Sequence, residues 1–286
     1  MNTPPRQLPV CFPPYPDELL SSWIGRHAAF YEVPPLVMLR HCLPEASSLR
    51  AADLQLNSDQ QIRLANMYAT EPTVVRRMTF TNVAQSSRRL IAARPTQICT
   101  SCSPGHTEPT LILRSQLPGW RITCPLCGNQ FRDADGRELP SPFRQYRSAG
   151  LHGQELLDDE AERDVKTWAS PAGIVRLLLM RRRVLPFPPE KELWRFRVLG
   201  KIIPELDELL AEVSTSFPTP QNPVLPLHLR PALLAGVAMV HAGGAEMLFM
   251  LRQSTFGFHR HRFDREAMPF FINASRKRHS TQMQLI

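Results

Sequence analysis

Two pairs of cysteines, each spaced C-x-x-C, are the feature that most constrains what this chain can fold into. The first pair reads C-T-S-C and the second C-P-L-C, with 21 residues between them. A two-residue gap lets both sulfurs of a pair occupy one edge of a tetrahedron, so two pairs complete a structural zinc site and leave no open position for catalysis. We therefore expect one structural zinc ion bound by Cys99, Cys102, Cys124 and Cys127.

The residues between the two pairs predict a small zinc ribbon over residues 99–135. Residues 111–114 and 120–123 are rich in apolar and β-branched side chains, as hairpin strands are, and Pro118-Gly119 supplies a turn. Two alternatives stay open. A redox dithiol would need one pair in a βαβ setting, and His106 could replace a cysteine as a ligand.

The arrangement of all six cysteines indicates the cell compartment. Four of the six cysteines fall into the two pairs, which in a chain without a visible secretory signal indicates metal rather than disulfides. Cys11 and Cys42 are expected to be single buried or half-buried thiols. Since no secretory signal is visible, we expect a cytoplasmic protein. No apolar run reaches about 18 residues, so we expect no membrane-spanning helix.

The charge of the chain favours a polyanionic partner. The formal net charge is +8 and the pI about 9.6, and 30 arginines stand against 4 lysines. Guanidinium groups bind phosphates through a bidentate fork, which an ammonium group cannot form. A GC-rich genome explains the same excess of arginine without any function, so the charge alone does not decide.

The first helix is predicted from an apolar stripe of helical period over residues 19–31. We expect Asp17 to cap this helix at its first residue, Glu18, because a carboxylate accepts from the unpaired N–H groups of the first turn. Trp23 lies on the stripe and is expected to anchor the core. Arg26 is expected to pair with Asp17 or Glu18 rather than with DNA.

More short helices are predicted in the rest of residues 1–98. Pro34-Pro35 ends the first helix and starts a second, and Ser58 with Gln61 forms a capping box for another. Glu71-Pro72 opens the next one after a tight turn, and its outer side is basic. Two short helices joined in this way indicate a helix-turn-helix, and an ordinary packed pair with solvated arginines is the alternative.

Clusters of basic side chains are the candidates for DNA binding, with solvated surface charge as the alternative. One cluster lies on and just after the second helix of this pair. Another lies in the C-terminal tail, where His259 and His261 alternate with Phe258 and Phe263, and Arg181 to Arg183 form a further run. The DNA-binding candidates are Arg76, Arg77, Arg88, Arg89, Arg94, Arg260, Arg262, Arg276, Lys277 and Arg278.

The chain as a whole is expected to be mainly α, with a helical, helix-turn-helix-like region over 1–98 and the four-cysteine zinc ribbon over 99–135. A helical region over 145–286, binding DNA or a partner, completes it. Gly243-Gly244 is expected to break a helical stretch over 228–250. The remaining expectations are linkers over 133–150 and 214–226 and helices near 168–179, 190–199 and 204–213.

Three blocks of sequence resemble the TniQ/TnsD family of transposition-targeting proteins. The first is Y-P-D-E-L-L-S-S-W-I-G-R-H-A at residues 15–28, because a Pro precedes an Asp/Glu-Ser-x-x-Ser-Trp-x-x-Arg run in that family. The second spans residues 62–80, and the third is the C-x-x-C, Trp, C-P-x pattern. The blocks occur in the family's order over the first half of the chain. One departure is Cys127, where the family commonly has histidine.

The resemblance implies a non-catalytic target-selection adaptor for DNA transposition. Such proteins recognise target DNA or a guide-RNA effector complex and recruit an AAA+ ATPase; whether the chain forms a homodimer is left open. The sequence also lacks a phosphate loop, a nucleophile elbow and an H-E-x-x-H pair, and the adjacent Asp158, Asp159 and Glu160 are expected to form a solvated helix face. A zinc-containing DNA-binding transcriptional regulator is the alternative.

Overall fold

The computed structural model describes residues 7–103, 111–134, 141–184, 193–196, 198–206 and 225–283. These residues are mainly helical, which confirms the predicted fold class. They fall into two compact units. Unit 1 holds the described residues of Met1–Val83 and Ile91–Glu138, and unit 2 holds those of Ala84–Leu90, Leu139–Thr219 and Val224–Ile286.

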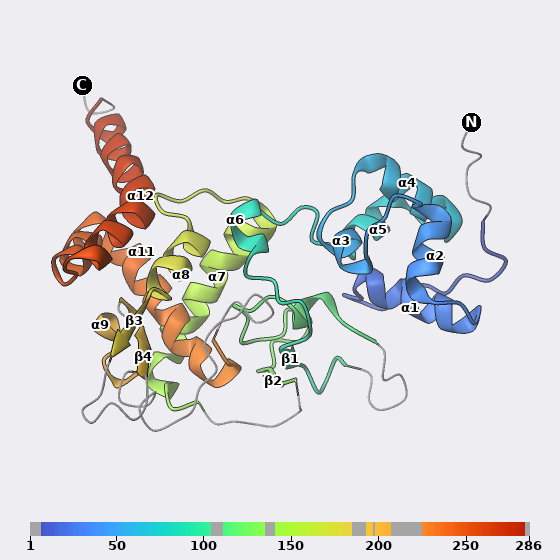
Figure 1. Ribbon diagram of the computed structural model, residues 1–286, viewed down its shortest axis with the longest axis horizontal. Helices are drawn as coiled ribbons and strands as arrows, with labels where there is room; N and C mark the ends of the chain where they lie inside the picture. The colour runs from blue at the N-terminus through green and yellow to red at the C-terminus, as the bar shows by residue number, and fades with distance from the viewer. Residues whose placement is uncertain are drawn as a thin grey trace. The chain divides into compact units, whose positions relative to one another are not determined.

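Short helices build the N-terminal part of unit 1 (Figure 1, blue to cyan). The predicted stripe is confirmed, because Leu20, Trp23, Ile24 and Ala28 of the first helix are all buried. They pack with residues of the following helices into one core, which includes Tyr68. The helices are α1 (Leu20–Phe30), α2 (Pro35–Cys42), α3 (Leu49–Leu54), α4 (Ser58–Met67) and α5 (Pro72–Arg77).

Local capping explains where most of these helices start, with one shift in register. Pro35 and Pro72 occupy the first helical position of α2 and α5, where a missing N–H costs nothing. The capping box of α4 is formed by Asn57 and Gln60, one residue before the predicted pair. Helix α3 was not predicted, although Ser48 caps it through its hydroxyl.

The expected cap of α1 is wrong. The helix begins at Leu20, and Asp17 lies outside it with a left-handed φ of 60°. Its carboxylate instead accepts from the backbone N–H of Ser115, 98 residues further along the chain (Oδ2···N 2.9 Å). The residue is therefore bound to a distant segment rather than to its own helix.

The segment with the cysteine pairs is also folded differently from the expected hairpin. Strand β1 (Gln97–Ile98) pairs antiparallel with β2 (Arg132–Asp133), and a single bridge joins Thr123 to Gln130. Part of the first predicted strand is a 3-10 helix, η1 (Arg114–Gln116). The predicted strands over 111–114 and 120–123 do not pair with each other, because Leu113 bridges to Glu18 instead.

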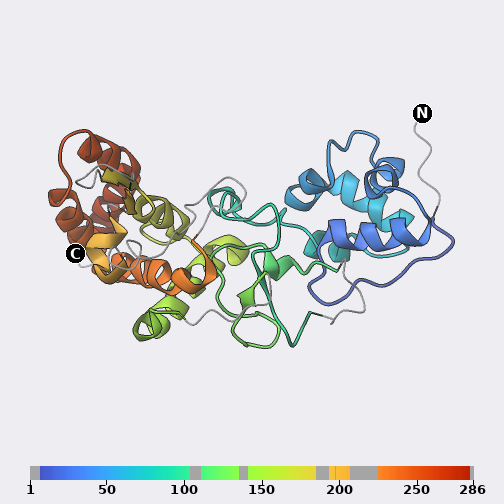
Figure 2. The ribbon, with the colours of Figure 1, turned by 60° about the horizontal axis from the view of Figure 1, so that its bottom comes forward.

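Unit 2 is built around long helices that pack side by side (Figure 1 and Figure 2). Helices η2 and α7 show that the predicted linker over 133–150 is wrong from residue 144, and residues 135–140 lie outside the described part. The helices of unit 2 are α6 (Gln85–Arg88), η2 (Arg144–Tyr146), α7 (Arg147–Arg163), α8 (Pro171–Leu178), α9 (Leu199–Ile202), η3 (Leu227–Leu229), α11 (Arg230–Gln253) and α12 (Phe258–Met283).

A small antiparallel sheet replaces the helix predicted over 190–199. Strand β3 (Arg181–Val184) pairs with β4 (Leu193–Phe196), and Arg181 lies opposite Phe196. Only a short turn of α9 follows. Most of the helix predicted over 204–213 and of the linker predicted over 214–226 lies outside the described residues.

Helix α11 confirms the predicted break, because Gly244 has a non-helical φ of 62° and ψ of −152° within it. Residues 227–253 are long and apolar enough to cross a bilayer by length and composition, a test that the core helix of a soluble protein also passes. The first half of α11 packs on α7 and α8 and is almost wholly buried. We interpret it as the core helix of unit 2.

Candidate metal centre and basic surface

Two similar turns carry the four cysteines. In each turn a backbone N–H donates to the carbonyl of the first cysteine of the pair: Ser103 N to Cys99 O (2.8 Å) and Gly128 N to Cys124 O (2.9 Å). Asn129 Nδ2 donates to Ser101 Oγ at 2.9 Å and joins the two turns. The local sequence therefore folds each C-x-x-C pair so that its two sulfurs lie on the same side.

The four sulfurs meet, as the sequence predicts. The Sγ atoms of the quartet all lie within 4.8 Å of one another, and those of Cys99 and Cys127 are 3.4 Å apart. A zinc ion with four thiolates at ~2.3 Å forms a tetrahedron whose edges are about 3.8 Å. The spacing of the sulfurs fits such an ion, and the donor set of four sulfurs suits zinc.

The quartet has a buried side and an exposed side. Cys99 and Cys124 are buried, Cys102 is partly buried and Cys127 is exposed. Burial raises the pKa of the Cys124 thiol, whereas the backbone N–H of Asn129 lowers the pKa of the Cys127 thiol. Solvent therefore reaches the site at Cys127. His106, the predicted substitute ligand, lies outside the described residues.

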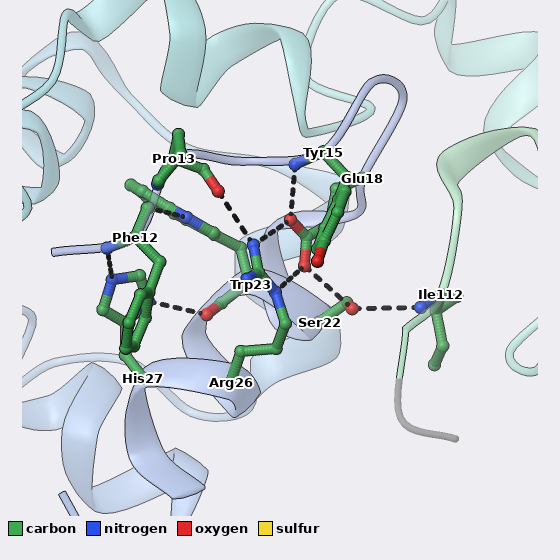
Figure 3. A network of polar contacts seen from close by, with 9 residues as sticks. All are labelled: Phe12, Pro13, Tyr15, Glu18, Ser22, Trp23, Arg26, His27 and Ile112. Atoms are coloured by element: carbon green, nitrogen blue, oxygen red, sulfur yellow. Dashed lines mark hydrogen bonds and ion pairs between the residues drawn. The ribbon is translucent and has the colours of Figure 1, made fainter. Parts of the chain in front are cut away.

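Glu18 is the centre of a polar network at the start of α1 (Figure 3). The carboxylate is fully buried and accepts from Arg26 Nε at 2.8 Å and Nη2 at 2.7 Å, from Ser22 Oγ at 3.2 Å and from the backbone N–H of Tyr15 at 2.9 Å. The predicted pairing of Arg26 with an acidic neighbour is confirmed. The motif residues around Trp23 therefore form a structural network.

His27 completes this network on the other side of Trp23 (Figure 3). The backbone N–H of Phe12 donates to His27 Nε2 at 3.0 Å, so Nδ1 carries the proton and faces the carbonyl of Trp23 at 2.9 Å. Burial lowers the pKa of His27 and keeps the ring neutral. The indole N–H of Trp23 also donates to Phe12 O at 2.8 Å, which confirms its role as a core anchor.

The predicted basic residues of unit 1 lie at the surface. Arg76 and Arg77 are exposed in the last turn of α5, while Val75 and Met78 beside them are buried in the helical core. Arg94 is also exposed, in the segment before β1. Helix α5 therefore has the predicted division into an apolar inner side and a basic outer side.

The other predicted basic residues belong to unit 2. Arg88 ends α6 and Arg89 follows it, and Arg260 and Arg262 lie near the start of α12 with partly and fully exposed side chains. Phe263 is fully buried, so the expected surface of alternating histidines and aromatic rings is wrong at that residue. The side chains of Arg181 to Arg183, Phe258, Arg276, Lys277 and Arg278 lie outside the described part of the chain.

Glu160 is a buried residue whose position the sequence reasoning missed. It was expected on a solvated face, yet its carboxylate accepts from Ser86 Oγ at 3.1 Å and from the N–H of Ala172 at 2.8 Å, and also bonds the hydroxyl of Ser170. It therefore caps the start of α8. The Ser170-Pro171 pair predicts the start of α8 from the sequence, but it does not show that Glu160 would accept hydrogen bonds there.

Comparison with known proteins gives one finding. The family model TniQ matches residues 9–149. This region contains the network around Glu18, the four cysteines and the exposed arginines of α5. No curated protein and no solved structure matches the chain.

Proposed function

The chain belongs to the TniQ family and is a transposition-associated target-selection protein, and on that premise we propose that it acts as a non-catalytic adaptor. It recognises target DNA, directly or through a guide-RNA effector complex, and recruits an AAA+ transposition ATPase. The match over residues 9–149 carries the proposal, because the motif residues of that region are built into one buried network.

The metal chemistry supports a non-catalytic role. In the part of the chain that the structure describes, the four cysteines are the one group of His, Cys, Asp and Glu side chains that could hold a metal ion. Four thiolates fill a tetrahedral site and leave no position for a water or a substrate. We therefore propose that Cys99, Cys102, Cys124 and Cys127 bind one structural zinc ion.

The outer side of α5 is the surface that we propose for DNA. Arg76 and Arg77 are adjacent and exposed at its C-terminal end, and their neighbours Val75 and Met78 fix the helix to the core. The planar fork of a guanidinium group is pre-organised, so less side-chain entropy is lost for each hydrogen bond that it forms with a phosphate. The preceding α4 packs against α5, which is the arrangement expected of a helix-turn-helix-like pair.

A salt titration tests this surface. Binding of a random-sequence DNA duplex is followed by fluorescence anisotropy at several salt concentrations, with wild type, the Arg76→Ala/Arg77→Ala double variant and the Arg260→Ala/Arg262→Ala double variant. Each phosphate contact that is lost lowers the salt slope, so the first variant should bind more weakly with a slope reduced by roughly one to two units.

The comparison of the two double variants decides between the candidate clusters. If only the Arg260→Ala/Arg262→Ala variant showed a smaller salt slope of DNA binding, the DNA-binding surface would lie on unit 2 and not on α5. Absence of any binding by wild type would contradict direct DNA recognition and favour an adaptor that contacts only proteins or a guide-RNA complex.

A further inference from the structure

The segment that carries the four cysteines, residues 97–133, is called the metal segment below. Its described residues are hydrogen-bonded directly to the start of α1 within unit 1. Four hydrogen bonds connect residues 112–115 to residues 17–22, and the serine bridge among them is visible in Figure 3. They run from Leu19 N to Ile112 O (2.9 Å), Ile112 N to Ser22 Oγ (3.0 Å), Arg114 N to Asp17 O (2.7 Å) and Ser115 N to Asp17 Oδ2 (2.9 Å).

The same segment is tied to the first cysteine turn on its other side. Gln116 Nε2 donates to Ser103 Oγ at 3.2 Å, and Ser103 closes the turn that begins at Cys99. Gln97, two residues before Cys99, donates its Nε2 to Ser115 O at 3.0 Å. Residues 112–116 are therefore hydrogen-bonded to residues 97 and 103, on either side of the first cysteine pair, and to residues 17–22 at the start of α1.

Several residues that make these contacts are buried, which makes the bonds costly to break. Ser22 is 5% exposed, and Gln97 and Ser115 are 0% exposed. A buried donor that loses its acceptor is left without water to replace it. Asp17 adds a geometric constraint, since its left-handed φ is uncommon outside glycine and is held here by two bonds to the metal segment.

We propose that Asp17 and Ser22 form a clasp that couples metal binding to the docking of helix α1. The inference rests on the zinc site proposed above. Binding of the metal orders the cysteine turns, the turns hold residues 112–116, and that segment holds the start of α1 through the clasp. Loss of the metal is thereby transmitted to the helical core that carries Trp23, and the region does not behave as a free ribbon on a linker.

Hydrogen exchange measured by mass spectrometry on the full chain tests the coupling. The zinc content is first measured by elemental analysis, and exchange is then compared before and after removal of zinc by a chelator. Peptides within residues 19–30 should exchange at least roughly five-fold faster without the metal, the change expected when about one buried hydrogen bond is lost. Peptides of α7, in unit 2, provide the reference.

The outcomes separate the two proposals. A zinc-loaded chain in which chelation accelerates exchange only within residues 97–133 would overturn the coupling and leave the metal site intact. A chain purified with no metal would overturn the metal site and the coupling with it.

A pair of serine variants provides a second measurement. Ser22→Ala removes the hydroxyl of the clasp, whereas Ser48→Ala removes the hydroxyl that caps α3 in the same unit. In competition with a chromophoric chelator, Ser22→Ala should weaken zinc binding roughly five-fold, and Ser48→Ala should leave it unchanged. Equal zinc affinities in the two variants would contradict the clasp.

Discussion

The two units of this protein are held together by different means. Among the described residues, ten buried side chains of unit 1 are polar or charged, against four in unit 2. Unit 1 buries Glu18, Ser22, His27, Asp53, Gln61, Thr79, Gln97, Ser115, Gln116 and Arg121, and unit 2 buries Ser87, Glu160, Arg230 and Thr255.

The difference follows from what each unit has to fix in place. In the described part of the metal segment of unit 1 the strands are two residues long, so side-chain hydrogen bonds and, as proposed, a metal must hold its path. Unit 2 instead packs long helices closely, with a glycine of α7 against the backbone of α11. A buried polar group destabilises the fold when it loses its partner, whereas closely packed helices are destabilised when a side chain is added between them. Different substitutions should therefore destabilise the two units.

The largest effect is expected at the cysteines. Cys124→Ser removes a buried thiol of the proposed zinc site, and structural zinc sites contribute roughly 10–16 kcal/mol of binding free energy in small zinc-dependent folds. Residues 97–133 should lose both zinc and protection from hydrogen exchange, while α7 and α11 of unit 2 keep theirs. Elemental analysis and exchange by mass spectrometry measure the two quantities.

Cys11→Ser is the matched control, because Cys11 lies outside the quartet and bonds only weakly to backbone carbonyls. That variant should retain one zinc per chain. A Cys124→Ser protein with full zinc content and normal exchange would remove the proposed dependence of unit 1 on metal.

The second effect tests the close packing of unit 2. A Cβ at Gly153 would lie 2.0 Å from the carbonyl oxygen of Leu234 and 2.7 Å from its carbonyl carbon, so Gly153→Ala must push α7 away from α11. We expect the free energy of unfolding of unit 2 to fall by about 3 kcal/mol. Exchange of α7 peptides in increasing urea measures this change without requiring a single transition for the whole chain.

Gly25→Ala on α1 is the opposite case. A Cβ at Gly25 meets no atom within 4 Å, so the substitution should stabilise α1 by about 0.5–1 kcal/mol through helix propensity alone. If Gly153→Ala were as well tolerated as Gly25→Ala, the helices of unit 2 would not depend on close packing.

The sequence predictions succeed for features that depend on local contacts and fail for several that depend on distant ones. Each C-x-x-C pair, the helix starts at Pro35 and Pro72 and the break at Gly244 depend on residues a few positions apart, and each appears in the structure as predicted. Spacing and backbone preference determine such features before any tertiary contact forms.

Three of the wrong predictions involve partners that are far away in the sequence. Asp17 binds Ser115 instead of capping α1, and Leu113 pairs with Glu18 instead of a hairpin strand. Glu160 caps α8 and bonds Ser86, 74 residues before it, although its neighbours in sequence indicate a solvated face. No periodicity within a window of residues reports these bonds, because the chain must fold before the partners meet.

The third effect concerns the buried carboxyl of Asp53, in α3 of unit 1. The side chain is 3% exposed, and its Oδ1 accepts from Ser21 N at 2.9 Å. Burial raises the pKa of Asp53 to about 6, although bonds to Ser21 and the charge of Arg50 oppose the rise. The native carboxyl therefore binds its proton more tightly than the unfolded one does.

This raised pKa fixes the sign of the pH dependence that Asp53 gives to the stability of unit 1. The contribution of Asp53 to stability is fully present below about pH 4, where both states are protonated, and is lost as the pH rises through about 6. Asp53→Asn keeps the acceptor for Ser21 but cannot ionise, so the stability difference between variant and wild type should shift by about 2 kcal/mol in favour of the variant from pH 4 to pH 7. Urea unfolding of α1 and α3, followed by hydrogen exchange at each pH, measures that difference, in which the titration of other groups such as His27 cancels.

Asp53→Ala separates charge from hydrogen bonding, since it leaves the N–H of Ser21 without an acceptor and should be destabilised at every pH. Parallel stability curves for Asp53→Asn and wild type would show that the buried carboxyl imposes no pH-dependent cost on unit 1.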